Sequence, residues 1–381
     1  MDKTLRFGVF MAPFHALDAA PTLFFRRDLE LIDHADQLGF DEAWIGEHHS
    51  GGVEMIGAPE VFIAAAAERT KRIRLGTGVK SLPMHHPFIV AETMVQLDHM
   101  TQGRTMFGVG PGALPTDGAM LGIDVRNTRR MMGESLDVIM RLLAGERVTQ
   151  ETDWFRLDDA KLQLDCYTRP RMEMAVTTVR SPAGARAAGQ HGLGMLSLGG
   201  VSDDALAAYD ANWAVCEKAA AEHGRTVDRR HFRVAMFMHL ADTAERARDD
   251  VHFGIDGWAR YARDILPFSP VPADVTDVFE FLVENRRAVI GTPADAIDAI
   301  ERIQAGSGGF GVILLMAHDW ADWNATRHSY ELFARHVIPH FQNGLAGRRT
   351  SYDFSKARLK GLLSAAQEGL AAAQEEDKSR Q

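Results

Sequence analysis

The chain has 381 residues, of which 46% are hydrophobic and 25% charged, and its formal net charge is −10. This composition is typical of a soluble globular protein with a sizeable core, and the negative charge argues against a general nucleic-acid binder, which needs a basic face. The two cysteines, Cys166 and Cys216, lack metal-site or disulfide-framework spacing. We interpret both as buried apolar residues of a protein from a reducing, cytoplasmic setting, and expect neither a signal peptide nor a membrane span.

Apolar runs and segments with helical spacing alternate along the chain. The apolar runs that we interpret as strands are 5–11, 41–47, 73–80, 104–112, 171–179, 193–199, 232–241 and 310–317. The segments that we interpret as helices are 21–40, 58–70, 85–101, 127–145, 181–192, 203–224, 243–254, 292–307 and 323–341. The runs are mostly continuous rather than alternating, which indicates parallel strands buried on both faces. Eight such units favour a closed (β/α)8 barrel over an open doubly wound sheet.

Two stretches, 146–170 and 255–288, interrupt this alternation. The second is rich in proline and aromatic residues, and long insertions of this kind are often functional. We expect it to form a lid over the barrel mouth, with Trp258, Tyr261 and Phe268 facing an apolar substrate pocket. The alternative is that these aromatic side chains pack on the outer helices. The barrel should span 1–341, followed at 342–381 by a charged linker and a marginal helix.

The chemistry of such a barrel sits where its strands end. Most of the expected strand ends are apolar, small or hydroxylic, and they place the following residues at the mouth: Met11, Phe14, His15, Gly78, Val79, Gly110 and Thr178. Glu47, His48 and His49 follow the second strand, but adjacent residues point in different directions and cannot all chelate one ion, so we expect no metal site. A mouth with few polar groups suits a large flat cofactor.

A possible anion site lies in "TVRSPAG", residues 178–184, between the fifth strand and a helix. Here the backbone N–H groups of a helix start, the Ser181 hydroxyl and the Arg180 guanidinium could converge on a phosphate. The alternative is that Ser181 only caps the helix while Arg180 is solvated.

Three motifs in register carry a family resemblance: "FDEAWIGEHH", "RIRLGTGVKSLPMHHP" and "QLDHMTQGRTMFGVGPG". They resemble the bacterial-luciferase-like family of flavin-dependent monooxygenases over roughly residues 5–340, most closely its limonene-monooxygenase-like and alkanal-monooxygenase-like branch. The resemblance implies a (β/α)8 barrel that binds reduced FMN delivered by a separate NAD(P)H:flavin reductase. O2 would add to the flavin as a C4a-peroxyflavin and oxygenate a small to medium apolar substrate, such as a terpenoid, a cyclic ketone or an aldehyde.

The resemblance also assigns roles to residues. His48 matches the family's catalytic histidine, and Glu47 matches a carboxylate that helps to position flavin and imidazole. Gly78–Val79 lies where the family holds the isoalloxazine ring, often with a non-proline cis peptide. The family commonly dimerises through the helix at 58–70 and the next one, around 96–100, so we expect a homodimer.

The sequence departs from the family at the fourth strand end, where Pro111 replaces an arginine that binds the phosphate in some members. The positive charge stands instead at Arg180, beside Ser181. This departure leaves a deazaflavin-dependent oxidoreductase on the same barrel as one alternative. A second alternative, from another functional class, is a non-catalytic barrel that stores or sequesters flavin.

Overall fold

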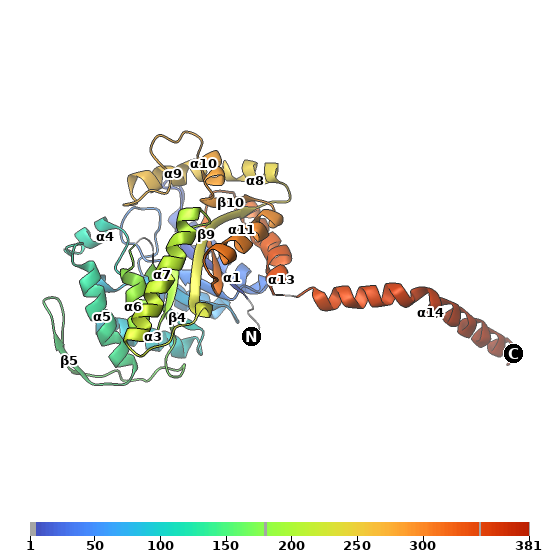
Figure 1. Ribbon diagram of the computed structural model, residues 1–381, viewed down its shortest axis with the longest axis horizontal. Coiled ribbons are helices and arrows are strands. Elements are labelled where there is room, and N and C mark those ends of the chain that lie inside the picture. The colour runs from blue at the N-terminus through green and yellow to red at the C-terminus, as the bar shows by residue number, and fades with distance from the viewer. Residues whose placement is uncertain (1–4, 179–180, 343, 381) are drawn as a thin grey trace. The chain divides into compact units, whose positions relative to one another are not determined.

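The computed structural model describes residues 5–178, 181–342 and 344–380. The chain divides into two units, Met1–Val337 and Ile338–Gln381. In the first unit, eight parallel strands form a closed barrel, confirming the predicted (β/α)8 fold (Figure 1). These strands are β1 (Arg6–Phe14), β2 (Glu42–Ile45), β3 (Arg74–Ser81), β4 (Thr105–Gly110), β7 (Glu173–Thr178), β8 (Gly194–Leu198), β9 (Phe232–Leu240) and β11 (Val312–His318). The barrel closes because β9 pairs with both β8 and β11, and β11 pairs with β1.

The helices that follow the strands cover the outside of the barrel. They are α1 (Pro21–Leu38), α2 (Pro59–Arg69), α3 (Pro87–Met100), α5 (Thr128–Leu143), α6 (Ala183–His191), α7 (Asp203–Glu222), α8 (Ala244–Val251), α11 (Pro293–Gly306) and α12 (Trp323–Leu332). Four of them have a proline in the first turn, where the missing N–H costs no helical hydrogen bond. A short helix, α4 (Pro115–Met120), and three single turns lie between the longer elements: η1 (Leu82–Met84), η2 (Arg229–His231) and η3 (Phe333–Val337).

Both interruptions of the βα alternation contain regular structure. Residues 146–170 include an antiparallel hairpin, β5 (Val148–Glu151) and β6 (Arg156–Ala160). Residues 255–288 form α9 (Ile255–Asp264) and α10 (Val278–Glu284), which lie with α8 at one end of the barrel (Figure 1). A short strand that we did not predict, β10 (Ala288–Gly291), then pairs with the C-terminal half of β9.

A cluster of ion pairs links the strands at the N-terminal end of the barrel, opposite the mouth. Arg233 has no exposed surface, donates from Nε to Glu42 Oε2 at 2.7 Å and also binds Glu173. Arg6 and Arg74 complete the cluster, with nitrogen–oxygen distances of 2.7 Å to Glu42 and 2.6 Å to Glu173. These residues stand at the beginning of β1, β2, β3, β7 and β9, so one network ties five strands together at a distance from the barrel mouth.

The second unit contains α13 (Ile338–Phe341) and α14 (Ala346–Ser379). α14 is continuous over 34 residues, where the sequence had indicated a linker and a marginal helix. Across the part of the chain that the structure describes, no helix combines the length and apolar character needed to cross a membrane.

Candidate functional site

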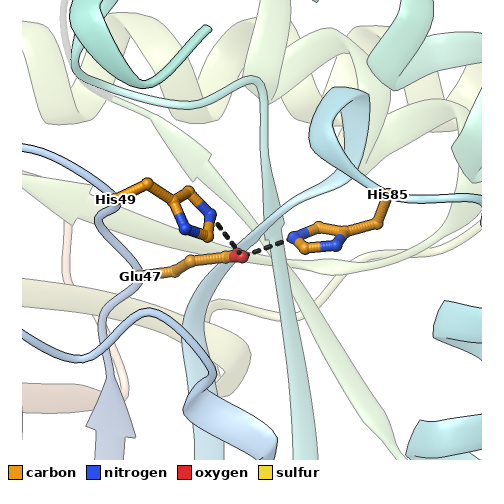
Figure 2. A group of neighbouring side chains, drawn as sticks. All are labelled: Glu47, His49 and His85. Atoms are coloured by element: carbon orange, nitrogen blue, oxygen red, sulfur yellow. Dashed lines mark hydrogen bonds and ion pairs between the residues drawn. The ribbon is translucent and has the colours of Figure 1, made fainter. Parts of the chain in front are cut away.

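Glu47 organises the ends of β2 and β3. Its side chain is fully buried, and its Oε2 accepts the backbone N–H of Ser81 at 2.7 Å. Its Oε1 accepts from Lys80 Nζ at 3.1 Å, from His49 Nε2 at 3.2 Å and from His85 Nε2 (Figure 2). Burial alone would raise the pKa of this carboxyl, but the hydrogen bonds of the two histidines and the charge of Lys80 outweigh it and hold the pKa well below its usual range. Glu47 is therefore an anion that links the two strand ends.

Glu47, His49 and His85 also bring three potential metal ligands together, with ligand atoms within 4.8 Å of one another. The adjacent His48 is not part of this cluster, because its side chain contacts Asp117 and Glu54 instead. The third member is His85, from the segment that follows β3. The ammonium of Lys80 contacts the same Glu47 oxygen as the two imidazoles. A second cation at this oxygen would meet that fixed positive charge, so the cluster is better suited to hydrogen bonding than to a metal.

His48 lies between two carboxylates. Its Nδ1 is 3.1 Å from Asp117 Oδ2, and its Nε2 is 3.3 Å from Glu54 Oε2. The hydroxyl of Tyr261 donates to the other oxygen of Glu54 at 2.8 Å. Burial lowers the pKa of His48, but the bond to Asp117 and the charges of Glu54 and Asp117 raise it above the ordinary value.

Sequence reasoning missed Asp117 and Glu54. Asp117 stands in the first turn of α4, where it also accepts the backbone N–H of His49 and the hydroxyl of Ser50. Glu54 is carried back toward His48 by a turn in which Gly51 and Gly52 have φ values of +84° and +75°. The paired glycines were the sequence signal for this turn, since such a backbone favours glycine.

The peptide bond between Gly78 and Val79 is cis, as the family resemblance implies. At this point the pairing register of β3 with β4 shifts, and the Val79 side chain is half-buried at the strand end. A Cβ on Gly110 would lie 2.6 Å from Val79 Cγ2 and 2.8 Å from Thr177 Cγ2. The glycine therefore permits close contact among the ends of β3, β4 and β7.

The predicted anion site is described only in part. Thr178 is buried at the end of β7 and its hydroxyl bonds that of Ser197. Ser181 is half-buried, and its hydroxyl accepts the N–H of Ala183, the first residue of α6, at 3.3 Å. Arg180 lies outside the described residues. A hydroxyl that accepts a hydrogen bond can still donate its own hydrogen, so this contact of Ser181 is compatible with an anion site.

Of the residues predicted at the first strand end, Met11 is buried in the barrel and His15 is held in an ion-pair network. His15 Nδ1 is 2.8 Å from Asp319 Oδ2, its Nε2 is 3.1 Å from Asp28, and its ring stacks on Phe24. Burial lowers the pKa of His15, but the bonds to Asp28 and Asp319 raise it to about 9. This histidine is thus a fixed cation beneath the mouth.

A cavity of about 810 Å³ opens beside these residues, a volume that suits a small molecule. One part of its wall is apolar and includes Phe14, Gly51, Val53, Tyr261 and Ile265, and another part carries the charged residues Asp18, Arg27, Asp256, Arg260, Asp264 and Asp319. Phe14 and Tyr261, two of the aromatic residues predicted for the substrate pocket, therefore line this cavity. Within the described chain, the cavity lining does not include the other two aromatic residues predicted for the pocket. Trp258 packs in the core against Phe237 and Trp320, with centroid distances of 4.9 and 5.0 Å, and Phe268 is 69% exposed.

Comparison with known proteins gives consistent matches over most of the chain. The sequence model of a family described as luciferase-like monooxygenase matches residues 5–309. Limonene 1,2-monooxygenase of Rhodococcus erythropolis is 47% identical over 347 residues, covering 91% of this chain and 89% of that protein. The 4-hydroxyprotoasukamycin monooxygenase of Streptomyces nodosus subsp. asukaensis is also 47% identical, over 375 residues, covering 96% of this chain and all of that protein.

A solved structure shares the fold at a detectable level of sequence identity. The oxygenating constituent of 3,6-diketocamphane monooxygenase from Pseudomonas putida, a type II Baeyer–Villiger monooxygenase solved in complex with FMN, superposes with a TM-score of 0.74 at 28% identity. The match covers 88% of this chain and 98% of that one.

Proposed function

This chain belongs to the luciferase-like monooxygenase family, and we propose that it is the oxygenating component of a two-component system that uses reduced FMN, O2 and a separate NAD(P)H:flavin reductase. The observation that carries the proposal is the placement of His48, a buried imidazole held between two carboxylates in the loop after β2. The third strand of the same barrel contains the cis peptide at Gly78–Val79, near its C-terminal end. The relatives' names support an oxygenase.

The residues present at the mouth fit a flavin. Partly buried apolar side chains at the strand ends, Ala12, Val79, Leu198 and Met316, offer a surface on which a flat ring can lie. A phosphate could be held by the backbone N–H groups at the start of α6 and by the hydroxyl of Ser181. Arg180, which precedes Ser181 in the sequence, could add its positive charge. Bound reduced FMN would supply the oxygen-activating chemistry, through the C4a-peroxyflavin that the family resemblance implies.

The chain's own residues then position groups, move a proton and exclude water. Glu47 fixes the ends of β2 and β3, so that the loop bearing His48 and the cis peptide hold a constant separation. His48 supplies an imidazole that can hold and pass a proton, and its carboxylate neighbours raise its pKa above the ordinary value. The apolar walls of Phe14, Val53 and Ile265 limit the access of water to the reacting groups.

We assign the substrate to the class of small to medium apolar molecules, of terpenoid, cyclic ketone or aldehyde type. The size of the 810 Å³ cavity and the apolar part of its wall, formed by Phe14, Val53 and Ile265, support this class. The names of the relatives, which mention limonene, diketocamphane and 4-hydroxyprotoasukamycin, are compatible with it.

Substitution of His48 tests the proposal. His48→Ala should retain flavin binding but lose product formation, while NADH oxidation by the reductase continues and hydrogen peroxide accumulates. Loss of general acid–base catalysis alone corresponds to a decrease of about 10²–10⁴-fold in product formation. His223→Ala, on the exposed end of α7, is the matched control. An unchanged product yield in His48→Ala would remove this residue from the mechanism.

The cofactor is tested by absorption titrations with FMN, reduced FMN, riboflavin and a deazaflavin. Reduced FMN should bind more tightly than oxidised FMN. Arg180→Ala should weaken FMN about 10- to 100-fold, because a charge-assisted bond to phosphate contributes roughly 1.5–3 kcal/mol, and it should affect riboflavin much less. Equal weakening of both flavins would refute the phosphate assignment. Preferential binding of the deazaflavin would favour an oxidoreductase that needs no oxygen, and flavin binding without turnover would favour a storage barrel.

A further inference from the structure

His48 and Glu54 make a direct side-chain contact, and the proposed function has so far given Glu54 no role of its own. Glu54 Oε2 is buried and has no hydrogen-bond partner of ordinary geometry among the described residues, yet it lies 3.3 Å from His48 Nε2. Both side chains are only 13% exposed. Burying a carboxyl oxygen without a hydrogen-bond partner costs free energy. The protonation state of Glu54 Oε2 must therefore depend on the imidazole that it faces.

The hydrogen bonds around His48 and Glu54 determine how many protons lie between His48 Nε2 and Glu54 Oε2. Asp117 accepts from the backbone of His49, from Ser50 and from His48, and although burial raises its pKa, these bonds bring the pKa below the usual range. An ionised Asp117 requires Nδ1 of His48 to be the donor. Tyr261 donates to Oε1 of Glu54, which leaves Oε2 facing Nε2. With no proton between them two lone pairs would meet, and with two protons two donors would meet.

We propose that Glu54 is the proton-sharing partner of His48: one proton occupies the Nε2–Oε2 contact, and Tyr261 of α9 positions the carboxyl for it. This inference rests on the proposed function only for its catalytic consequence. In the transfer, the N–H bond at Nε2 breaks as an O–H bond forms at Oε2, or the reverse, and no other reactant is required. Glu54 acts through His48 and is therefore a positioning residue.

The electrostatic surroundings agree with this arrangement. Burial raises the pKa of Glu54, against the opposing effects of the His48 charge and the Tyr261 hydrogen bond, and the pKa of His48 is also raised. The other charged groups that act on the pair are Asp117 of α4, Glu47 of the same loop and His15, which directly follows β1. Burial thus favours the protonated form of Glu54, and the neighbouring carboxylates favour the protonated form of His48, so the two groups compete for a proton and titrate as a pair.

Tyr261 connects the pair to the substrate region. Its ring lines the 810 Å³ cavity, while its hydroxyl holds Glu54. A change in the position of α9 or in the occupancy of the cavity acts on the same side chain that orients the carboxyl. The proton affinity of His48 is thereby linked to the element that we predict to be the lid.

The test is an NMR titration of His48 in FMN-free protein. The chain has 16 histidines, so His48→Gln assigns the resonance. Glu54→Gln preserves the shape but cannot carry the shared proton or a negative charge, and it should lower the His48 midpoint by about one pH unit or more, the usual effect of removing a charge at this distance. Tyr261→Phe should shift the midpoint in the same direction by a smaller amount. Glu222→Gln, on the exposed end of α7, should leave it unchanged.

A second readout connects the pair to turnover. In Glu54→Gln, the pH at which oxygen use changes from product to peroxide should move in the same direction as the NMR midpoint. An unchanged His48 midpoint in folded Glu54→Gln or Tyr261→Phe overturns the proposal, and if Glu54→Gln does not fold, Tyr261→Phe decides it. Absence of flavin binding or product in the wild type would refute the proposed function instead, while the titration in flavin-free protein would still decide the pairing.

Discussion

Glu47 shows how one residue can serve both the stability and the chemistry of this barrel. Its folded-state pKa lies below the unfolded value of about 4.3, so its ionised form stabilises the native protein above that pH. This contribution is lost progressively as the pH falls below about 4.3 toward the folded pKa. The sign follows from the depressed pKa, since the unfolded chain takes up the proton first.

We predict that Glu47→Gln destabilises the protein at neutral pH by roughly 1.5–3 kcal/mol, because it removes charge-assisted hydrogen bonds to a buried oxygen. The difference from the wild type should narrow as the pH falls below about 4. Urea unfolding at several pH values measures both effects. Glu68→Gln, on the exposed face of α2, is the control, and a difference that is independent of pH would show that Glu47 stabilises by packing alone.

The same residues show what the sequence could predict at this scale. Glu47 and His48 were predicted because a carboxylate and imidazoles directly follow a strand and match a family motif. Asp117 and Glu54 could not be predicted, because only the folded chain brings them next to His48. Asp117 comes from a short helix after β4, and Glu54 from the turn formed by two glycines. Local patterns name the residues at a strand end but do not reveal which distant side chains surround them.

At the scale of elements, the buried charges at the strand beginnings determine how five strands meet. We predict that Arg233→Met lowers the free energy of unfolding by about 3–5 kcal/mol, because it leaves Glu42 and Glu173 buried without their shared partner. Arg230→Met, which removes a surface pair with Asp228, should cost at most about 1 kcal/mol. Denaturant unfolding of the two variants measures the difference, and equal effects would contradict the account.

The segment 255–288 combines a buried helix with a connecting loop. α9 packs Ile255, Trp258 and Tyr261 against the apolar cluster at the mouth, whereas residues 265–277 join α9 to α10 without a helix or strand. If the segment is a lid, limited proteolysis within 255–288 should slow when reduced flavin and an apolar substrate are both present. Cleavage in the hairpin region 146–170 should not respond. Cleavage within 255–288 that is indifferent to ligands would contradict the lid.

The order of elements was predictable because continuous apolar runs and helical spacing alternate so regularly. β10 was missed because its four residues, "AVIG", directly precede a capped helix start and form no separate apolar run of typical strand length. The β5–β6 hairpin was missed because its strands are mostly polar and exposed on one face. Both cases show tertiary pairing imposing a strand where local pattern gives little signal.

At the scale of the whole molecule, the exposed apolar side chains indicate where a second copy could bind. α2 and α3 pack side by side, and they expose Val61 (68%), Ile89 (56%) and Met100 (50%). Leu164 and Tyr167 add to the exposed apolar surface near α3, since the Tyr167 ring contacts His99 at a centroid distance of 5.7 Å. Apolar surface of this kind on a folded protein typically marks an interface.

We therefore predict a homodimer through α2 and α3, with a mass in light scattering at micromolar concentration of twice the 42.1 kDa of one chain. Ile89→Glu should shift the protein toward the monomer, because a desolvated charge at the centre of an interface costs several kcal/mol. Leu370→Glu, on the exposed surface of α14, is the matched control and should leave the mass unchanged. A monomeric wild type would contradict the prediction. A dimer that survives Ile89→Glu but not Leu370→Glu would place the interface on α14 instead, where basic residues gather in the first half of the helix and acidic ones toward its end.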